Sequence, residues 1–164
     1  MSSRVIEEAD MDRPVVRRKK ISASTPGTRR TEIDAGEYGT FVTDEPVAHG
    51  GTGEGPSPLQ AVLGALCGCE SVTFNRTAAE HDLADDALDF EAEFTIDIRG
   101  RQGTRGVRQH FQTVRVQATV TTAASADDLA EVIAETEARC PVYNLIKDAG
   151  VNLEVVWVRR DPSA

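Results

Sequence analysis

The three cysteines of this sequence, Cys67, Cys69 and Cys140, are its residues best suited to chemistry. A thiol can be a redox centre, a nucleophile or a metal ligand. Cys67 and Cys69 lie two positions apart in a predicted helix, so their side chains diverge by about 200° and cannot form a disulfide with each other unless the helix unwinds. The histidines, at positions 49, 81 and 110, show no zinc-ligand spacing with these cysteines. We therefore expect neither a metal nor another cofactor.

Cys140 lies on the predicted inner face of a second helix, whereas Cys69 lies at the rim of the apolar stripe of the first. The predicted helices therefore allow these two thiols to come into contact in the folded chain. The alternative is that all three cysteines are small buried hydrophobic residues, which is the usual state of free cysteine. Spacing by itself leaves both interpretations standing.

The first helix is predicted from Pro58 to His81. Ser57 can cap it together with Gln60, and proline suits its first position. One side of the helix is apolar and the opposite side carries small residues in place of charged ones. The small residues are Ala61, Gly64, Ala65, Gly68 and Ser71. This pattern predicts a central helix that is buried all round, wrapped by sheets and open to close approach by a second subunit.

Strands and shorter helices are predicted around this long helix. A strand over 38–44 follows a weaker one over 21–33, which Pro26 and Gly27 interrupt. The glycine-rich loop 49–55 lacks a Gly-Lys-Ser/Thr ending, so we interpret it as a mobile or tight connection and not as a phosphate site. The later elements are expected to be a strand over 88–98, a turn over 100–106, a strand over 107–121 with a bulge between Phe111 and Val114, a helix from Ser125 to Cys140, a short helix ending at Gly150 and a strand over 151–158. This order is typical of the α+β class.

The composition limits the classes of partner. The chain has 164 residues, with 18 basic and 27 acidic side chains and a net charge of −9, and this charge disfavours a nucleic-acid partner. Its longest apolar stretch is about eleven residues, too short to span a membrane. We expect a flexible arm over 1–20, a single domain over 21–164 and, without a signal sequence, a cytoplasmic location.

Two short motifs resemble those of the OsmC/Ohr superfamily, named for osmotically inducible protein C and organic hydroperoxide resistance protein. The first is Pro56-Ser57-Pro58, followed by an apolar helix that ends in Cys67-Gly68-Cys69. The second is Cys140-Pro141-Val142, and the strands between the motifs contain an Asp-x-Arg-Gly turn at 97–100. The resemblance covers roughly residues 28–158. It implies an α+β OsmC-like fold, with a long buried central helix wrapped by antiparallel sheets in an intertwined homodimer.

The resemblance also implies a chemistry for two of the thiols. Cys69 corresponds to the reactive cysteine, which attacks an organic hydroperoxide, releases an alcohol and becomes a sulfenic acid. Cys140 corresponds to the resolving cysteine, which closes a disulfide that an external dithiol then reduces, often a lipoylated protein. Cys67 falls where the family usually has a small residue, and we interpret it as structural.

The sequence departs from the family pattern in the residues that activate the reactive thiol. The family places a glutamate nine or ten residues before the cysteine, where this chain has Gln60 and Leu59. Gln60 either holds an arginine through its carbonyl or only closes the helix cap. Arg29 and Arg30 are the candidates for the family's activating arginine, and the alternative is that they are two exposed strand charges.

Glu70 falls inside the apolar stripe next to Cys69, where a carboxylate is costly unless it is paired. We expect it to pair with an arginine at a subunit interface or to replace the missing acid.

The sequence leaves three functions open. The first is a thiol peroxidase of the peroxiredoxin type, with an apolar pocket lined by Leu59 and Leu66 that admits alkyl or fatty-acid hydroperoxides. The second is a dimeric binding or redox-sensing protein that has lost efficient catalysis, an interpretation that rests on the missing glutamate. A thiol transferase acting on another electrophile is a third alternative.

Overall fold

The computed structural model describes residues 12–163, which belong to two compact units, Met1–Pro56 and Ser57–Ala164. The predicted arm over 1–20 lies largely outside the described residues, and residues 12–21 are exposed and form no helix or strand. The single domain expected over 21–164 stays a prediction. The two units are described separately below.

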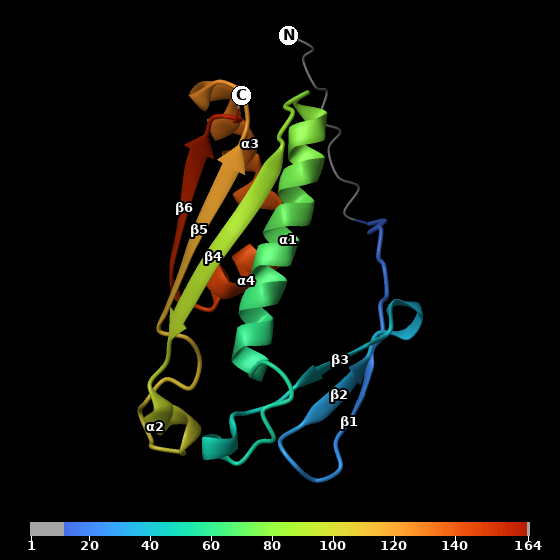
Figure 1. Cartoon of the computed structure of the whole chain (residues 1–164), viewed down its shortest axis with the longest axis vertical. Coiled ribbons are helices and arrows are strands. Elements are labelled where there is room, and N and C mark those ends of the chain that lie inside the picture. The colour runs from blue at the N-terminus through green and yellow to red at the C-terminus, as the bar shows by residue number, and fades with distance from the viewer. Residues whose placement is uncertain (1–11, 164) are drawn as a thin grey trace. The chain divides into compact units, whose positions relative to one another are not determined.

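The first unit contains a three-stranded antiparallel sheet in the order β1 (Ser22–Ser24), β2 (Thr31–Asp34), β3 (Thr40–Thr43) (Figure 1). The weak strand expected over 21–33 is in fact two strands, because the chain turns between them at the Pro26-Gly27 break. Gly27 has a φ of 82°, a backbone conformation that favours glycine. The strand expected over 38–44 forms as β3, preceded by a 3₁₀ turn at Gly36–Tyr38.

The glycine-rich loop that follows β3 is held by the carboxylate of Asp44. Its Oδ2 accepts hydrogen bonds from the Thr52 backbone amide at 2.9 Å, the Thr52 hydroxyl at 2.6 Å and the Glu54 amide at 3.2 Å, and its Oδ1 accepts from the Glu45 amide at 2.8 Å. These donors, led by the Thr52 hydroxyl, lower the pKa of Asp44 to about 2 although burial opposes them. The loop amides thus serve an internal anion, and the expectation of a tight connection is met.

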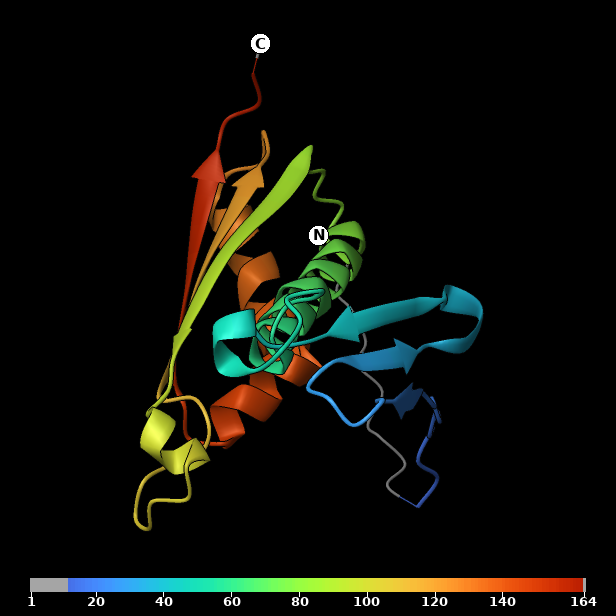
Figure 2. The ribbon, with the colours of Figure 1, turned by 60° about the horizontal axis from the view of Figure 1, so that its bottom comes forward.

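The second unit is a layer of helices on one face of a three-stranded sheet (Figure 2). The sheet has the order β4 (Ala87–Thr95), β5 (Thr113–Thr121), β6 (Asn152–Arg160). β4 and β5 are antiparallel and pair Phe90 with Ala118, whereas β5 and β6 are parallel and pair Ala118 with Trp157. The parallel pair needs a crossover, and α3 (Ala126–Arg139) and α4 (Pro141–Asp148) supply it.

The long helix α1 (Pro58–Glu80) begins at the predicted cap. The Ser57 hydroxyl accepts from the Gln60 amide at 3.2 Å, and Gln60 Oε1 accepts from the Ser57 amide at 2.9 Å, which completes a capping box. Its inner face contributes to two apolar clusters against the sheet, one around Leu63 and Leu66 and the other around Phe74 and Ala78. Helix, cap and inner face all agree with the sequence-based expectation.

The outer face of α1 departs from the expectation of burial on every side. Val62 is 40% exposed and Val72 is 56% exposed, and a Cβ atom added at Gly64 or Gly68 would meet nothing within 4 Å. Among the described residues of the second unit, an apolar, small-residue face of the longest helix is therefore left uncovered.

Two further details differ between 96 and 112. The expected turn begins as a short helix, α2 (Ile98–Arg101). Asp97 precedes this helix and caps it, because its side chain accepts a hydrogen bond from the Arg99 amide at 3.0 Å. The expected bulge between Phe111 and Val114 was wrong, because β5 begins only at Thr113 and the apolar residue Phe111 precedes the strand. None of the described helices is both long enough and apolar enough to cross a membrane.

Candidate thiol site

The second unit brings two of its three cysteines together. Cys69 lies on α1 and is partly exposed, and Cys140 lies at the junction of α3 and α4 and is fully buried. The two side chains are near neighbours, because the Cys69 thiol contributes to raising the pKa of Cys140. Both thiols are in the reduced state.

The Cys140 thiol is strongly held in its protonated form. Burial raises its pKa to about 11, with smaller contributions in the same direction from Cys69 and from the charge of Glu70. The backbone amide of Tyr143, in the first turn of α4, only partly offsets this. Because a thiolate is the nucleophilic form, Cys140 needs a way to lose its proton before it can react.

Cys67 faces a different environment from Cys140. It is partly exposed, and burial followed by the charge of Glu70 raises its pKa. Its contacts therefore give it no activated character. The interpretation of Cys67 as structural stays a prediction.

Glu70 is the unusual group of this region. Its side chain is 0% exposed, and neither carboxylate oxygen has a hydrogen-bond partner within the described structure. Burial raises its pKa to about 7, with a smaller contribution from the charge of Glu137. An arginine from a second subunit has no open path to a side chain that its own chain covers completely, so the expected interface ion pair is not supported.

Glu137 differs from Glu70 because both of its oxygens are engaged. Oε1 accepts from the indole nitrogen of Trp157 at 3.0 Å, and Oε2 accepts from the Tyr143 hydroxyl at 3.4 Å. The side chain of Asn144 donates to the backbone oxygens of Glu137 and Cys140, each at 2.9 Å. These bonds fix the turn from α3 to α4 and with it the position of Cys140.

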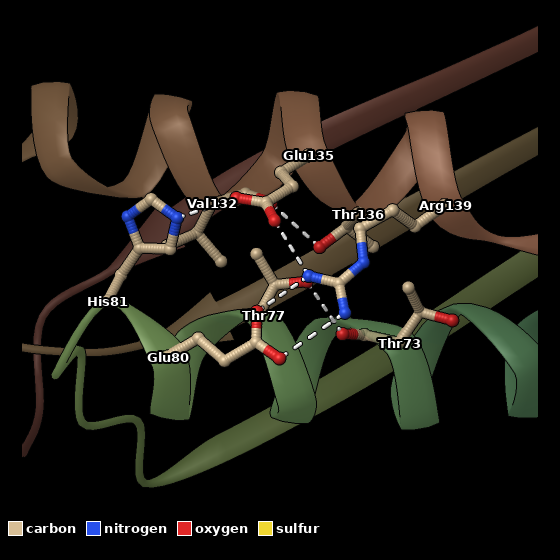
Figure 3. Close-up of polar contacts among 8 residues, drawn as sticks. All are labelled: Thr73, Thr77, Glu80, His81, Val132, Glu135, Thr136 and Arg139. Carbon is tan, nitrogen blue, oxygen red and sulfur yellow. Dashed lines mark hydrogen bonds and ion pairs between the residues drawn. The ribbon is translucent and has the colours of Figure 1, made fainter. Parts of the chain in front are cut away.

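A network of ion pairs ties the end of α3 to α1 one residue before Cys140 (Figure 3). Arg139 Nη1 lies 2.7 Å from a carboxylate oxygen of Glu80 on α1 and 2.7 Å from one of Glu135 on α3. His81 Nε2 lies 2.7 Å from the second oxygen of Glu135. Between the helices, buried threonine hydroxyls donate to their own helix backbones, as Thr136 does to Val132 O at 2.7 Å. The network holds the two cysteine-bearing helices in register.

Two residues expected at the site are used in other ways within the second unit. The carbonyl of Gln60 is engaged in the helix cap, so a role in holding an arginine stays a prediction. Leu66 is 0% exposed inside the apolar core, and Leu59 packs against that core. The apolar pocket expected at these leucines therefore stays a prediction. A hollow of about 530 Å³ lies instead on the outer sheet face, lined by charged residues such as Glu93, Arg115 and Glu154 and by none of the cysteines.

The two arginine candidates belong to the first unit and differ in their partners. Arg30 Nε donates to Glu54 at 2.6 Å, and its Nη2 lies 3.6 Å from Glu32, so two acids satisfy its charge. The pKa of Arg30 is raised, mainly by the hydrogen bond to Glu54. Arg29 is exposed, and its guanidinium lies so close to Gly50 that a Cβ atom added there would collide with Nη1. Arg29 has no carboxylate partner among the described residues.

Sequence reasoning missed Glu137 and Tyr143 as parts of the thiol environment. Glu137 stands three residues before Cys140 and Tyr143 three residues after it, with Pro141 between. A helical period places Glu137 on the side of α3 that carries Cys140, and this signal was overlooked. Pro141 interrupts that period before Tyr143. The available signal was the position of Tyr143 in the first turn of a helix that begins at Pro141.

Comparison with known proteins places this fold in a family. The sequence model of the OsmC-like protein family matches residues 51–156, and this chain belongs to that family. Its motifs, its mixed architecture of helices and sheets and its paired cysteines agree with that membership. No curated protein matches the chain.

Solved structures show the same fold at low sequence identity. An OsmC-like protein from Mycoplasma pneumoniae is 20% identical, with a TM-score of 0.71, over 87% of this chain and 98% of that one. An organic hydroperoxide resistance protein OsmC from Legionella pneumophila is 15% identical, with a TM-score of 0.59, over 89% and 98%. A putative organic hydroperoxide resistance protein from Vibrio cholerae, with captopril in one active site, is 18% identical, with a TM-score of 0.63, over 89% and 96%.

Proposed function

We propose that this protein is a thiol peroxidase that reduces organic hydroperoxides to alcohols. In the first step the Cys69 thiolate attacks the terminal oxygen of the hydroperoxide, the O–O bond breaks, and the alkoxide takes a proton to leave as the alcohol. In the second step Cys140 attacks the sulfur of the Cys69 sulfenic acid, and water leaves as the disulfide forms. An external dithiol, such as a lipoylated protein, restores both thiols.

The observation that supports this proposal most strongly is the proximity of Cys69 to Cys140. The two cysteines are about 70 positions apart in sequence and come from different helices, yet the Cys69 thiol contributes to the raised pKa of Cys140. The accessibility of the pair is also ordered as the two steps require, because Cys69 is partly exposed and Cys140 is fully buried. A peroxide can therefore reach Cys69 first.

Arg29 is our candidate for the cation that activates Cys69. A mid-helix cysteine gains nothing from a helix N-terminus, so its thiolate needs a nearby positive charge. Arg30 already has two acidic partners, whereas the Arg29 guanidinium has none among the described residues. Replacing Arg29 with alanine is expected to slow oxidation of Cys69 by at least tenfold, and replacing Arg30 with alanine serves as the matched control.

We also propose that two chains form a homodimer through the outer face of α1. This face is apolar, carries two glycines and lies exposed in the single chain. Small residues allow close approach of a second backbone. The cytoplasmic location expected from the sequence stays a prediction.

The test of the peroxidase is a stoichiometric reaction of the reduced protein with cumene hydroperoxide. Free thiols are counted, cumyl alcohol is quantified, and peptides are mapped by mass spectrometry without reduction. We expect one alcohol per chain and a disulfide between Cys69 and Cys140, with Cys67→Ser behaving like the unchanged protein and Cys69→Ser inert. Slow, unselective oxidation of all three cysteines would contradict the proposal.

A non-catalytic binding or redox-sensing protein is the second candidate. It is favoured by the environment of Cys67 and Cys140, because burial and a nearby thiol or acidic group raise the pKa values of these two thiols and no cation is among the causes. The same reaction distinguishes the two, since a sensor forms the disulfide once and shows no turnover when a dithiol is supplied. A thiol transferase would show alkylation of Cys69 without consumption of peroxide.

A further inference from the structure

Glu70 is a fully buried acid for which the fold has no evident use. A buried carboxylate normally has hydrogen-bond donors around it, because leaving its oxygens unpaired costs free energy. Both oxygens of Glu70 lack a partner among residues 12–163, whereas the neighbouring acid Glu137 has one for each oxygen. Such an unpartnered group in a native interior points to a ligand, a water or a reacting group that occupies the site at another stage.

The neighbours of Glu70 are the groups that react in the proposed cycle. It follows Cys69 directly on the inner side of α1, and its charge acts on Cys67 and on Cys140. The groups that face it from the packed helices are Glu137 on α3, Cys140 at the α3–α4 junction and Tyr143 on α4. Among these, Cys140 is the one whose reaction requires the loss of a proton.

We propose that Glu70 relays the proton of Cys140 to the oxygen that leaves Cys69 when the disulfide closes. This inference rests on the proposed peroxidase and assigns the proton transfer of its second step. The carboxylate takes the proton from the Cys140 thiol, and the Cys140 sulfur attacks the Cys69 sulfur as the S–O bond breaks. The departing hydroxide receives the proton and leaves as water, so that Cys140 is oxidised, the sulfenic sulfur is reduced and Glu70 regains its carboxylate.

The relay explains why the oxygens of Glu70 are unpartnered in the reduced protein. The sulfenic oxygen does not exist until Cys69 has reacted, and it is that hydroxyl, or the water formed from it, that supplies the missing hydrogen bond. A carboxyl whose pKa lies near 7 both accepts and donates a proton readily at neutral pH. Glu137 is unsuited to this task because Trp157 and Tyr143 already occupy its oxygens.

The first experiment follows single-turnover oxidation of Glu70→Gln in a Cys67→Ser background, compared with that background itself. One equivalent of cumene hydroperoxide is added, samples are quenched in acid, and mass spectrometry separates the sulfenic acid from the disulfide. We expect hydroperoxide consumption to stay within about threefold while disulfide closure slows by roughly 100-fold or more. In the variant the sulfenic acid then accumulates and is trapped by dimedone.

The pH dependence of closure supplies a readout that a merely structural role would not move. With Glu70 present, the rate is expected to rise with pH and level off near 7, as the carboxyl ionises. In Glu70→Gln this step disappears, and the rate climbs only towards the ionisation of Cys140 itself. Glu137→Gln keeps Glu70 but removes a charge that raises the pKa of Glu70. In this variant the rise of the closure rate with pH should therefore occur at lower pH.

A second reaction separates failure of the relay from failure of the peroxidase. The reduced protein is treated with 2,2′-dithiodipyridine, which forms a mixed disulfide at the accessible Cys69, and release of the second thiopyridone reports the attack by Cys140. If hydroperoxide is not reduced, the peroxidase proposal fails, but slower release in Glu70→Gln still supports proton removal by Glu70. Closure at the unchanged rate in Glu70→Gln at every pH, in both reactions, would overturn the relay.

Discussion

Two carboxylates of this protein show how surroundings set the behaviour of one chemical group. Asp44 is surrounded by hydrogen-bond donors and its pKa falls to about 2, whereas Glu70 has none and its pKa rises to about 7. Both side chains are fully buried. The difference lies in the hydrogen bonds that each receives, and it gives the two residues opposite effects on stability as pH changes.

Replacing Glu70 with glutamine is expected to stabilise the reduced protein above neutral pH. The pKa of Glu70 is raised by folding, so the folded state binds its proton more tightly and loses stability as pH rises from about 4.5 to 7. The shift corresponds to roughly 2–3 kcal/mol at pH 8, which glutamine avoids. Urea unfolding at pH 5 and pH 8 measures this, and a variant that is less stable than the natural chain at pH 8 would contradict it.

Replacing Asp44 with asparagine is expected to have the opposite dependence on pH. The pKa of Asp44 is lowered by folding, so its contribution is fully present above about pH 4 and is lost as pH falls towards 2. The variant should have a lower Tm at pH 7 and a flatter loss of Tm between pH 4 and 2. Asp34→Asn, at an exposed acid in β2, is the control, and equal acid profiles for all three proteins would argue against the role of Asp44.

The elements were largely predictable from sequence because their signals are local. The cap at Ser57 and the alternation along β4 both mark elements that the structure contains. The start of β5 was not predictable, because the apolar Phe111 packs into the core from a loop and imitates a strand position. The sequence-based prediction overestimated how far the outer face of α1 is buried. A stripe of small residues indicates close packing against another backbone, but it does not indicate whether that backbone belongs to the same chain or to a second one.

Bulky side chains on the outer face of α1 are expected to block the proposed dimer and leave the monomer folded. A Cβ atom added at Gly64 or Gly68 meets nothing within 4 Å in the described structure, and each substitution by leucine removes a helix-interior glycine that costs about 1 kcal/mol relative to alanine. Analytical ultracentrifugation should show dimers for the natural chain and monomers for the double variant. Ala134→Leu, on the exposed side of α3, provides the control.

A dimer that persists in the double glycine variant would place the subunit contact elsewhere. A natural chain that remains monomeric at high concentration would remove the dimer proposal altogether. In either case the fold of the monomer is checked by circular dichroism, so that loss of association is not confused with unfolding.

On the scale of the whole molecule, the paired thiols connect parts of the chain that are distant in sequence. α1 comes before β4 and β5, and Cys140 comes after them, so a disulfide between the two closes a loop of about 70 residues that includes most of the sheet. Sequence reasoning identified this pair of residues through two short motifs. It did not find Glu137 or Tyr143, because Pro141 interrupts the helical period before Tyr143 and Glu137 joins this region through its hydrogen bond with Tyr143.

Oxidation is expected to stabilise the protein through this loop. Closing a loop of about 70 residues restricts the unfolded chain by up to about 4 kcal/mol. In a protein of this size that corresponds to a rise in Tm of about 10 °C. Calorimetry of the reduced and peroxide-treated forms measures this rise in Tm. The Cys67→Ser variant should keep the rise on oxidation, and the Cys140→Ser variant should lose it. An oxidised form that melts at or below the temperature of the reduced form would mean that the bond strains the helices.

The acidic row on β4 has a consequence for solubility. β4 is an outer strand of its sheet, and Asp89, Glu91 and Glu93 are exposed along it. An unprotected strand edge invites backbone pairing with another molecule, and a row of like charges repels a second copy of the same strand. Neutralising these three side chains is therefore expected to make the outer strand of the sheet more prone to pair with a second copy of itself.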